Sequence, residues 1–412
     1  MSGYIHYRWV NTKGGAWTDA GNWSPAGGPP HPISLSPGAP PIIDGDATFA
    51  TGFKGSYTVT GTAVSPTITV DGDQVVFSNF QTSYLFQQAA SLRVIHGGSA
   101  TFSTSATFDA TGHESELGLS ADGGTVIVHG TFIGAVEVGA GGRLDISGNG
   151  ATVRSMFADL SVKAGGRIDI EQGGSLSAAG TVASGSFIVI QSGGHWTIAG
   201  IGGPVPRVLA GSIALLGGSI DTSHAGGAVV NTGAIWGHGE ISGGLENRYS
   251  IDAQGGTLSL SGSLTGNGFL AISPGATLAL DASTDEIVVF APFDARLHLA
   301  HGVAETGLLR GFGVGDQIDL AGTQVTRLGL QASGGNTVLT AYDQQSVVGH
   351  FTLAGHYAPG QIALSPDGHG GTVLTDVGAL GTKLAALPAG SAAWHAAYVA
   401  EQSYISHLPH LS

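Results

Sequence analysis

The sequence predicts an all-β protein, a right-handed parallel β-helix (β-solenoid) in which short strands stack coil upon coil. Three observations between about Ser91 and Asp281 lead to this fold class: glycine pairs recur, polar and apolar residues alternate after each pair, and the repeat is roughly 20 residues long. Alternation with period two gives each strand one buried face, and a short fixed repeat is typical of solenoids. The copies begin at Gly123, Gly141, Gly165, Gly193, Gly217, Gly255 and, more loosely, Gly275.

The glycine pairs are interpreted as corners. Glycine adopts backbone angles that other residues resist, so a pair of glycines allows a sharp turn before each strand. The apolar residues Leu144, Ile146, Ile168 and Ile170 are then predicted to line one shared interior. An antiparallel sandwich is the alternative, because it also combines glycine turns with alternation. The coil is favoured because the copies keep phase and no Asn-Gly or Asp-Gly hairpin turn cleanly separates them.

Composition narrows the classes of function. Of the 412 residues, 70 are glycine and only 10% are charged, so the outer faces of the coils should be neutral and rich in hydroxyl groups. The formal net charge is −15 with only 14 Lys and Arg, which disfavours nucleic acid and anionic membranes as partners. No apolar run approaches the roughly 18–20 residues of a membrane helix. The lack of cysteine fits a protein that works outside a bacterial cell without disulfides.

Residues 1–60 differ from the repeat and are predicted to cap the first coil. They hold Trp9, Trp17 and Trp23, followed by a proline-rich stretch. The first coil of a solenoid would otherwise expose an open core and unpaired strand edges, which bulky indole rings can cover. The alternative use of the three rings is a platform on which sugars stack.

This N-terminal segment also carries a family resemblance. The phrase Trp17-Thr18-Asp19-Ala20-Gly21-Asn22-Trp23-Ser24, followed by the proline-rich spacer and Asp46-Ala47-Thr48-Phe49, resembles the start of large bacterial autotransporter-like surface proteins built from β-strand repeats, an adhesin-like β-helix family. The resemblance covers residues 1–60 closely and the glycine repeat in style only. It implies display on a bacterial surface or release from the cell.

Residues 61–284 are predicted to form the β-helix, and residues 285–378 a C-terminal β region that either continues the coils or folds apart. The phrases Gly315-Asp316-Gln317-Ile318-Asp319-Leu320 and Asp367-Gly368-His369-Gly370-Gly371-Thr372 resemble the C-terminal β regions of bacterial proteins exported by type I systems, including RTX relatives. The resemblance implies calcium, for which Asp316 and Asp319 are the candidate ligands. The tandem Gly-Gly-x-Gly-x-Asp array of those relatives is missing.

Residues 379–412 form a tail in which apolar residues recur at helical spacing. We expect a short helix there, with Trp394 and Tyr398 docking on the last coil. The start of the chain shows no secretory leader. Type I substrates carry an uncleaved C-terminal signal, so the resemblance implies export through this tail.

One set of charged residues could carry chemistry. Arg143 and Arg167 hold the same place in consecutive copies, as do Asp145 and Asp169, and Asp221 is assigned that place in a later copy. Stacked rungs would bring equivalent residues to about 4.8 Å, close enough for two carboxylates to share a proton or hold a cation. Carboxylates on β-helical polysaccharide lyases and hydrolases do acid–base work in this way. The simpler interpretation is a surface salt-bridge lattice that contributes little.

Three functions remain open at this point. The leading hypothesis is a non-enzymatic bacterial protein, extracellular or on the cell surface, with a structural or adhesive role and the ability to assemble into fibres or a matrix. The alternatives are a polysaccharide-active β-helix enzyme, either a lyase or a glycoside hydrolase, and a non-catalytic glycan-binding module. Expected partners are a second copy of the chain and extracellular polysaccharide, without nucleic acid, membrane insertion or any cofactor besides calcium. The sequence contains no histidine motif with metal-ligand spacing, no nucleophile elbow and no phosphate loop.

Overall fold

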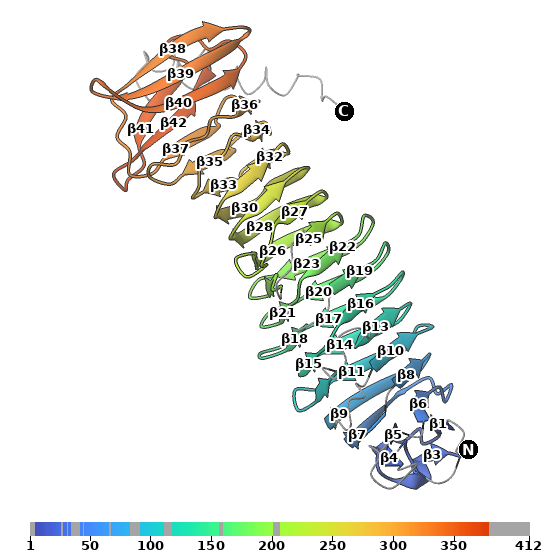
Figure 1. The fold of residues 1–412 in the computed structure, drawn as a ribbon. Coiled ribbons are helices and arrows are strands. Elements are labelled where there is room, and N and C mark those ends of the chain that lie inside the picture. The colour runs from blue at the N-terminus through green and yellow to red at the C-terminus, as the bar shows by residue number, and fades with distance from the viewer. Residues whose placement is uncertain are drawn as a thin grey trace, which may run out of the picture. The chain divides into compact units, whose positions relative to one another are not determined.

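A computed structural model describes residues 5–25, 28–30, 32–33, 42–43, 45–65, 67–82, 91–110, 118–155, 160–200 and 207–378. The chain divides into two compact units, unit 1 (Met1–Tyr249) and unit 2 (Ser250–Ser412). Both units are built from β-strands, and unit 1 also contains the 3-10 turn η1 (Ala20–Asn22). Figure 1 shows the strands of each unit lying side by side in successive rungs. Among the described residues, no helix has the length and apolar character needed to cross a bilayer.

Unit 1 is a coil stack with three strand-bearing faces, and its first face is one parallel sheet to which each coil contributes a strand. The strands of this face are β1 (Ile5–Trp9), β6 (Gly45–Phe49), β8 (Thr67–Asp71), β10 (Ser91–Ile95), β13 (Leu119–Asp122), β16 (Val136–Val138), β19 (Leu160–Val162), β22 (Gly180–Val182), β25 (Arg207–Leu209), β27 (Val229–Asn231) and β29 (Leu245–Asn247).

The second and third faces are the two halves of a bent parallel sheet. The second face contains β11 (Ser99–Phe102), β14 (Thr125–Val128), β17 (Arg143–Ile146), β20 (Arg167–Ile170) and β23 (Phe187–Gln191). The third face contains β12 (Thr107–Asp109), β15 (Thr131–Ile133), β18 (Thr152–Arg154), β21 (Ser175–Ser177) and β24 (His195–Thr197). Four longer strands run across both faces: β7 (Ser56–Ala63), β9 (Gln74–Thr82), β26 (Ser212–Asp221) and β28 (Ala234–Ser242).

The interior of unit 1 is the predicted one. Ile146 and Ile170 lie opposite each other in β17 and β20 and are both 0% exposed. Aromatic side chains stack between coils in the same way, because in-register parallel strands place equivalent side chains above one another. Phe77 and Phe102, for example, stack with ring centroids 5.1 Å apart. The parallel β-helix is therefore confirmed, and the antiparallel sandwich is excluded.

The two glycines of a pair have different tasks. The first glycine of a pair takes a left-handed backbone conformation, with φ of 68° at Gly141 and 75° at Gly193. The second lies against the coil below, where a Cβ on Gly142 would be 2.0 Å from the carbonyl oxygen of Ala121. A side chain at the first position would strain the backbone, whereas one at the second would force neighbouring coils apart.

The glycine pairs do not all lie at the same corner of the coil, however. Gly141 and Gly165 turn the chain into strands of the second face, whereas Gly173 and Gly193 turn it into strands of the third face. Glycine pairs occur at both corners because each corner is a tight turn between two strands of the same coil. The sequence repeat therefore mixes two columns of the coil.

The N-terminal tryptophans close the start of this stack. Trp9, Trp17 and Trp23 are 0%, 1% and 3% exposed, and Trp17 meets Trp23 edge to face with centroids 4.7 Å apart. Burial on all sides fits a cap and leaves no ring face for a sugar. Stacking already begins at β1, so the cap and the first coils overlap. Short strands complete the segment: β2 (Gly15–Ala16) on β7, β3 (Trp23–Ser24) on β1, and β4 (Pro32–Ile33) on β5 (Ile42–Ile43).

Unit 2 starts with further parallel coils, so that part of residues 285–378 continues the solenoid pattern. Its coil strands are β30 (Ser250–Ser261), β31 (Leu264–Gly266), β32 (Phe269–Ile272), β33 (Thr277–Leu280), β34 (Ile287–Phe290), β35 (Arg296–Leu299), β36 (Leu308–Arg310) and β37 (Gln317–Leu320). Those that pair as neighbouring rungs do so in parallel.

Antiparallel strands then close unit 2. This closing sheet consists of β38 (Arg327–Ser333), β39 (Asn336–Asp343), β40 (Ser346–Ala354), β41 (Ile362–Pro366) and β42 (Thr372–Asp376). β42 pairs antiparallel with β37, and β40 pairs in parallel with β36. The last coil is thereby covered by strands of the same chain. The predicted helix with Trp394 and Tyr398 lies outside the described residues.

Candidate functional site

The predicted arginine–aspartate pairs lie together on the outer side of the second face of unit 1. β17 and β20 are in register, so Arg143 lies opposite Arg167 and Asp145 opposite Asp169. Asp169 is the centre of the group and is 2% exposed. Its Oδ1 lies 2.6 Å from Nη2 of Arg167, and its Oδ2 lies 2.9 Å from Nε of Arg143. Two guanidinium groups therefore share one carboxylate.

Asp145 is less well satisfied. Its Oδ2 lies 3.4 Å from Nη2 of Arg143, and its Oδ1 has no hydrogen-bond partner among the described residues. Burial raises the pKa of the Asp145 carboxyl, an effect opposed by Arg143 and reinforced by the charge of Asp169. The hydrogen bonds to Asp169 raise the pKa of Arg167 and keep it charged. The four side chains therefore form a salt-bridge lattice in which one oxygen, Oδ1 of Asp145, has no hydrogen-bond partner among the described residues.

Two aromatic side chains extend this surface beyond the charged pairs. Phe187 is the register neighbour of Arg167 in β23, and the guanidinium carbon of Arg167 lies 5.3 Å from its ring centroid. The ring of Trp236, from β28, lies 6.4 Å from that of Phe187. Both rings are half-buried, so part of each is open to solvent. Neither ring was singled out from the sequence, and the alternation of polar and apolar residues gives no sign that the two would meet.

Asp221 does not belong to this column, contrary to the prediction. It ends β26 on the third face, opposite Thr197 and Ser242. Although burial acts in the opposite direction, hydrogen bonds from Ser223 and His224 hold the pKa of Asp221 below its ordinary value. The prediction failed because Gly217 turns the chain into the third face, whereas Gly141 and Gly165 turn it into the second.

Removal of the shared carboxylate should be costly. We expect Asp169→Ala to lower the free energy of unfolding by about 2 kcal/mol, because both arginines would lose their common partner. Each arginine side chain is 44% exposed, so solvent screening limits the loss. Urea denaturation of the purified proteins measures the difference. Asp221→Ala is the control and should cost no more than about 1 kcal/mol; equal losses in the two variants would show that the lattice adds nothing.

The two predicted calcium ligands do not face one site. Asp316 is 0% exposed, and its carboxylate accepts hydrogen bonds from the backbone N–H groups of Ala295 at 3.0 Å and Gly313 at 2.9 Å. Burial raises the pKa of Asp316 to about 6. Asp319 is instead paired with Arg296 at 2.7 Å and with His298. No group of three or more His, Cys, Asp or Glu suited to a metal ion occurs within the described parts of the chain.

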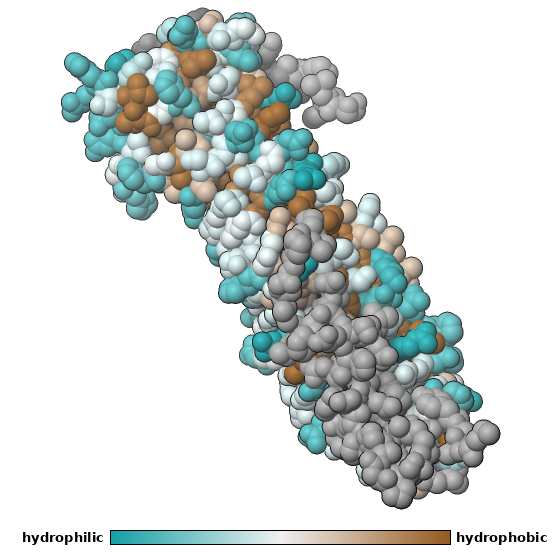
Figure 2. Space-filling model, viewed as in Figure 1, coloured by the Kyte–Doolittle hydropathy of each residue, from teal (hydrophilic) through white to brown (hydrophobic). Residues whose placement is uncertain are grey.

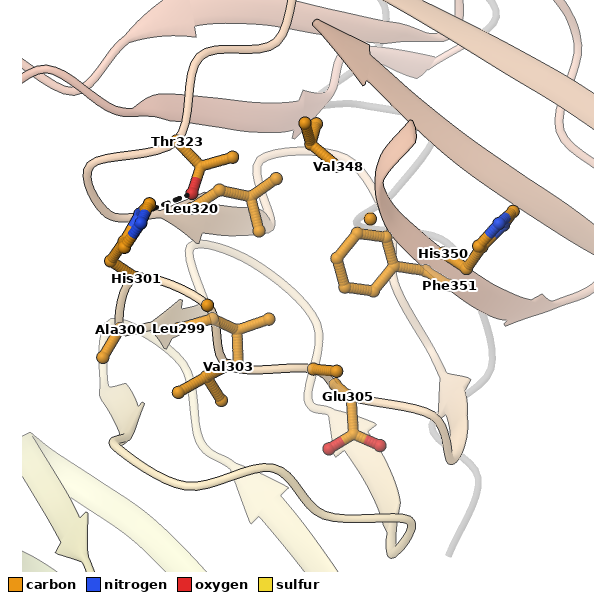
Figure 3. A pocket seen from close by; sticks show the side chains of 13 residues that line it. Leu299, Ala300, His301, Val303, Glu305, Leu320, Thr323, Val348, His350 and Phe351 are labelled. Atoms are coloured by element: carbon orange, nitrogen blue, oxygen red, sulfur yellow. Dashed lines mark hydrogen bonds between the residues drawn. The ribbon is translucent and has the colours of Figure 1, made fainter. Parts of the chain in front are cut away.

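A small cavity in unit 2 was not foreseen from the sequence. It measures about 240 Å³ and lies between the last coil and β40. Figure 3 shows apolar side chains among its labelled lining, including Leu299, Leu320, Val348 and Phe351. Such a cavity has room for a small apolar group but offers few convergent polar contacts.

Glu305 forms part of the wall of this cavity and is 1% exposed. In Figure 3 its carboxyl group points away from Phe351. One oxygen accepts the backbone N–H of Gly307 at 2.7 Å, and the other has no hydrogen-bond partner among the described residues. Burial, opposed by the Gly307 hydrogen bond and reinforced by Asp285 and Glu286, raises the pKa of Glu305 to about 8. Glu305 is therefore mainly protonated at neutral pH, as a buried carboxyl without a counter-ion should be.

Comparison with known proteins gives no further assignment. A scan against protein-family models finds no matching family, and a search of curated proteins finds no match. The resemblance to autotransporter-like and type I-exported proteins therefore stays a prediction. What can be said about function comes from the coil geometry and from the side chains described above.

Proposed function

We propose that this chain is a non-catalytic β-solenoid, secreted by or displayed on a bacterium, with a structural or adhesive role. The main support is that three of the carboxylates that were candidates for chemistry already have partners within the protein. Asp169 is held by two arginines, Asp316 by backbone amides, and Asp319 by Arg296 and His298. Hydrolysis or elimination on a polysaccharide needs carboxyl groups that exchange protons with the substrate, and these groups have protein partners instead.

The surface composition supports the same role. Only 10% of the residues are charged, and Figure 2 shows polar and apolar residues intermixed over the described surface that it displays. A regular backbone with few charged side chains can contact other surfaces over a wide area, and salt screens the repulsion that its formal net charge of −15 causes. Such a protein would work as a spacer or attachment element rather than as an enzyme.

Attachment is the direct test. We expect a non-adherent bacterial host that displays the chain to adhere to glass or to polysaccharide-coated plates several-fold more than the same host without it. Asp145→Asn, which alters the one incompletely bonded carboxyl of the lattice, should leave attachment unchanged. Release of reducing ends or unsaturated sugars from a panel of polysaccharides, abolished by Asp145→Asn, would overturn the proposal in favour of an enzyme.

A non-catalytic glycan-binding module is the second candidate, and the surface around Phe187 favours it. A half-buried phenyl ring, a half-buried indole at 6.4 Å and the 44% exposed side chain of Arg167 lie on one face. Aromatic faces receive the apolar side of a pyranose ring, while polar groups beside them receive hydroxyls. Binding on a glycan array that is lost in Trp236→Ala, but kept in Tyr249→Ala, would support this function. Identical profiles for both variants would exclude it for this surface.

A further inference from the structure

The closing sheet of unit 2 has one open edge at β38. β38 pairs with β39 along its full length, and the described residues place no strand on its other side. Figure 1 shows β38 as the outermost strand of this sheet. An unpaired edge presents a row of main-chain donors and acceptors that another strand can pair with.

The hairpin turn fixes which main-chain groups face outward. Gly334 and Gly335 have φ values of 57° and 87°, as in a two-residue type I′ turn, and Ser333 lies opposite Asn336. In such a hairpin the residues next to the turn form a hydrogen-bonded pair, and bonded and non-bonded pairs alternate from there. The N–H and C=O groups of every second residue of β38 therefore point away from β39; these residues are Leu328, Leu330 and Ala332.

The side chains at this edge are also incompletely covered. Leu330 lies opposite Leu339 and Leu328 opposite Ala341, so each pair shares one side of the sheet. Leu339 and Ala341 are 0% exposed, whereas Leu328 and Leu330 are only half-buried. Burial thus falls off at β38, where the sheet stops and no other described residue is seen to continue the apolar layer as a strand. A further strand beside β38 would cover both leucines.

The devices that usually protect an edge strand are absent from β38. It has no proline, lysine or acidic residue. Its single charge, Arg327, is held against its own sheet with the guanidinium carbon 3.6 Å from the ring centroid of Tyr342. The strand at the other edge differs, because β41 ends in Pro366 and the charged residue Asp367 follows. Proline and charge block strand addition, so only one of the two edges is open to it.

We propose that the partner of this edge is a second copy of the chain, whose own β38 adds antiparallel across a two-fold axis. The strand is self-complementary in the register centred on Leu330. Leu330 then faces Leu330 of the second copy, and Leu328 faces Ala332 of the second copy. Arg327 faces Ser333 of the second copy, so the only charge of the strand does not meet itself. All outward groups pair in this register, giving about six main-chain hydrogen bonds across a closed isologous interface.

The dimer should be weak and favoured by salt. One added strand pair buries less surface than a standard interface, so we expect dissociation in the micromolar range. Two copies each of formal net charge −15 repel one another, and added salt screens that repulsion. The inference extends the proposed scaffold role by naming its self-association surface. Its test is sedimentation of the purified chain, which does not depend on whether the protein promotes attachment.

Sedimentation velocity from about 1 to about 200 µM, at low and high salt, measures the association. Wild type should shift from monomer to dimer, more readily at high salt. Leu330→Pro removes an outward N–H but no bond to β39, and should weaken the dimer at least tenfold, whereas Leu330→Val keeps that N–H and should dimerise like wild type. Should Leu330→Pro fail to fold, Ala332→Lys places a charge at the edge, where it is exposed in the monomer, and should also abolish the dimer.

Cysteine cross-linking tests the register, and the chain has no cysteine of its own. Opposed residues of a hydrogen-bonded antiparallel pair have Cα atoms about 5.5 Å apart, within reach of a disulfide. Leu330→Cys should therefore form a disulfide-linked dimer on oxidation. Gln331→Cys, which is more exposed but would face Gly329 of the second copy, should not. A wild type that stays monomeric throughout, dimers unaffected by both Leu330→Pro and Ala332→Lys, or equal cross-linking at the two positions would each overturn the proposal.

Discussion

Gly142→Ala should destabilise unit 1 by about 3 kcal/mol or more, although it adds only a single methyl group at a coil corner. The new Cβ would lie 2.0 Å from the carbonyl oxygen of Ala121. That oxygen cannot move freely, because it accepts the backbone N–H of Gly139 at 2.7 Å and so joins two coils. Relief of the clash therefore breaks a buried hydrogen bond and separates close-packed coils. Hydrogen exchange of the amides in β14 and β17, together with thermal unfolding, measures the loss.

Gly141→Ala is the matched control, one residue earlier in the same corner. Gly141 has φ of 68°, and the nearest atom to an added Cβ would be Cα of Gly123 at 3.8 Å. The substitution should therefore cost only the strain of a left-handed alanine, about 1–2 kcal/mol. If the two variants lose equal stability, the clash of the Gly142 Cβ with Ala121 costs no more than the strain of a left-handed alanine at Gly141. Close approach of the coils would then not be what selects the second glycine.

The coil itself could be predicted because two local signals agree with one global structure. Period-two alternation assigned the inward residues, and glycine pairs marked the corners, so Ile146 and Ile170 were placed correctly and the register of Arg143 with Arg167 followed. Agreement between local and global preferences of this kind is what makes a fold readable from sequence. The antiparallel closing sheet was harder, because its strands alternate like those of the coils.

The remaining features depend on which corner a residue occupies, and the glycine phrase does not distinguish the corners. Asp221 follows a Gly-Gly pair as Asp145 does, yet lies on another face. The sequence gives no sign that Glu305 is buried, because it is a polar residue in a stretch that looks like a loop. In the structure it holds the same place as Thr284 in the preceding coil: the two lie opposite each other, and each side chain accepts the backbone N–H two residues further on. Position in the coil, rather than residue type, makes Glu305 buried.

Glu305→Gln should remove a large pH dependence from the stability of unit 2. The pKa of Glu305 is about 8 in the folded chain against 4.5 for an exposed glutamate. Below pH 4.5 the carboxyl is neutral in both states and folding gains fully from its burial. As the pH rises toward 8, the unfolded state ionises first, so the free energy of unfolding falls, in total by on the order of 4 kcal/mol. Glutamine keeps the shape and the acceptor for Gly307 without ionising, so the variant should be the more stable protein at pH 9.

Urea denaturation at pH 5, 7 and 9 measures the pH dependence of stability, and hydrogen exchange of β36 and β37 measures it locally. Together they separate the titration of Glu305 from that of other carboxyl groups in unit 2. Asp316, whose pKa is raised to about 6, acts in the same direction. In Glu305→Gln the free energy of unfolding should therefore still fall with rising pH below pH 6, but less steeply than in wild type. Asp343→Asn, at a half-exposed carboxylate of the same unit, is the control and should follow wild type. A variant with the wild-type pH profile would mean that Glu305 meets water or a counter-charge in solution. An acid-favoured unit 2 would instead follow directly from a carboxyl buried beside Asp285 and Glu286, since each neighbouring charge disfavours its ionisation.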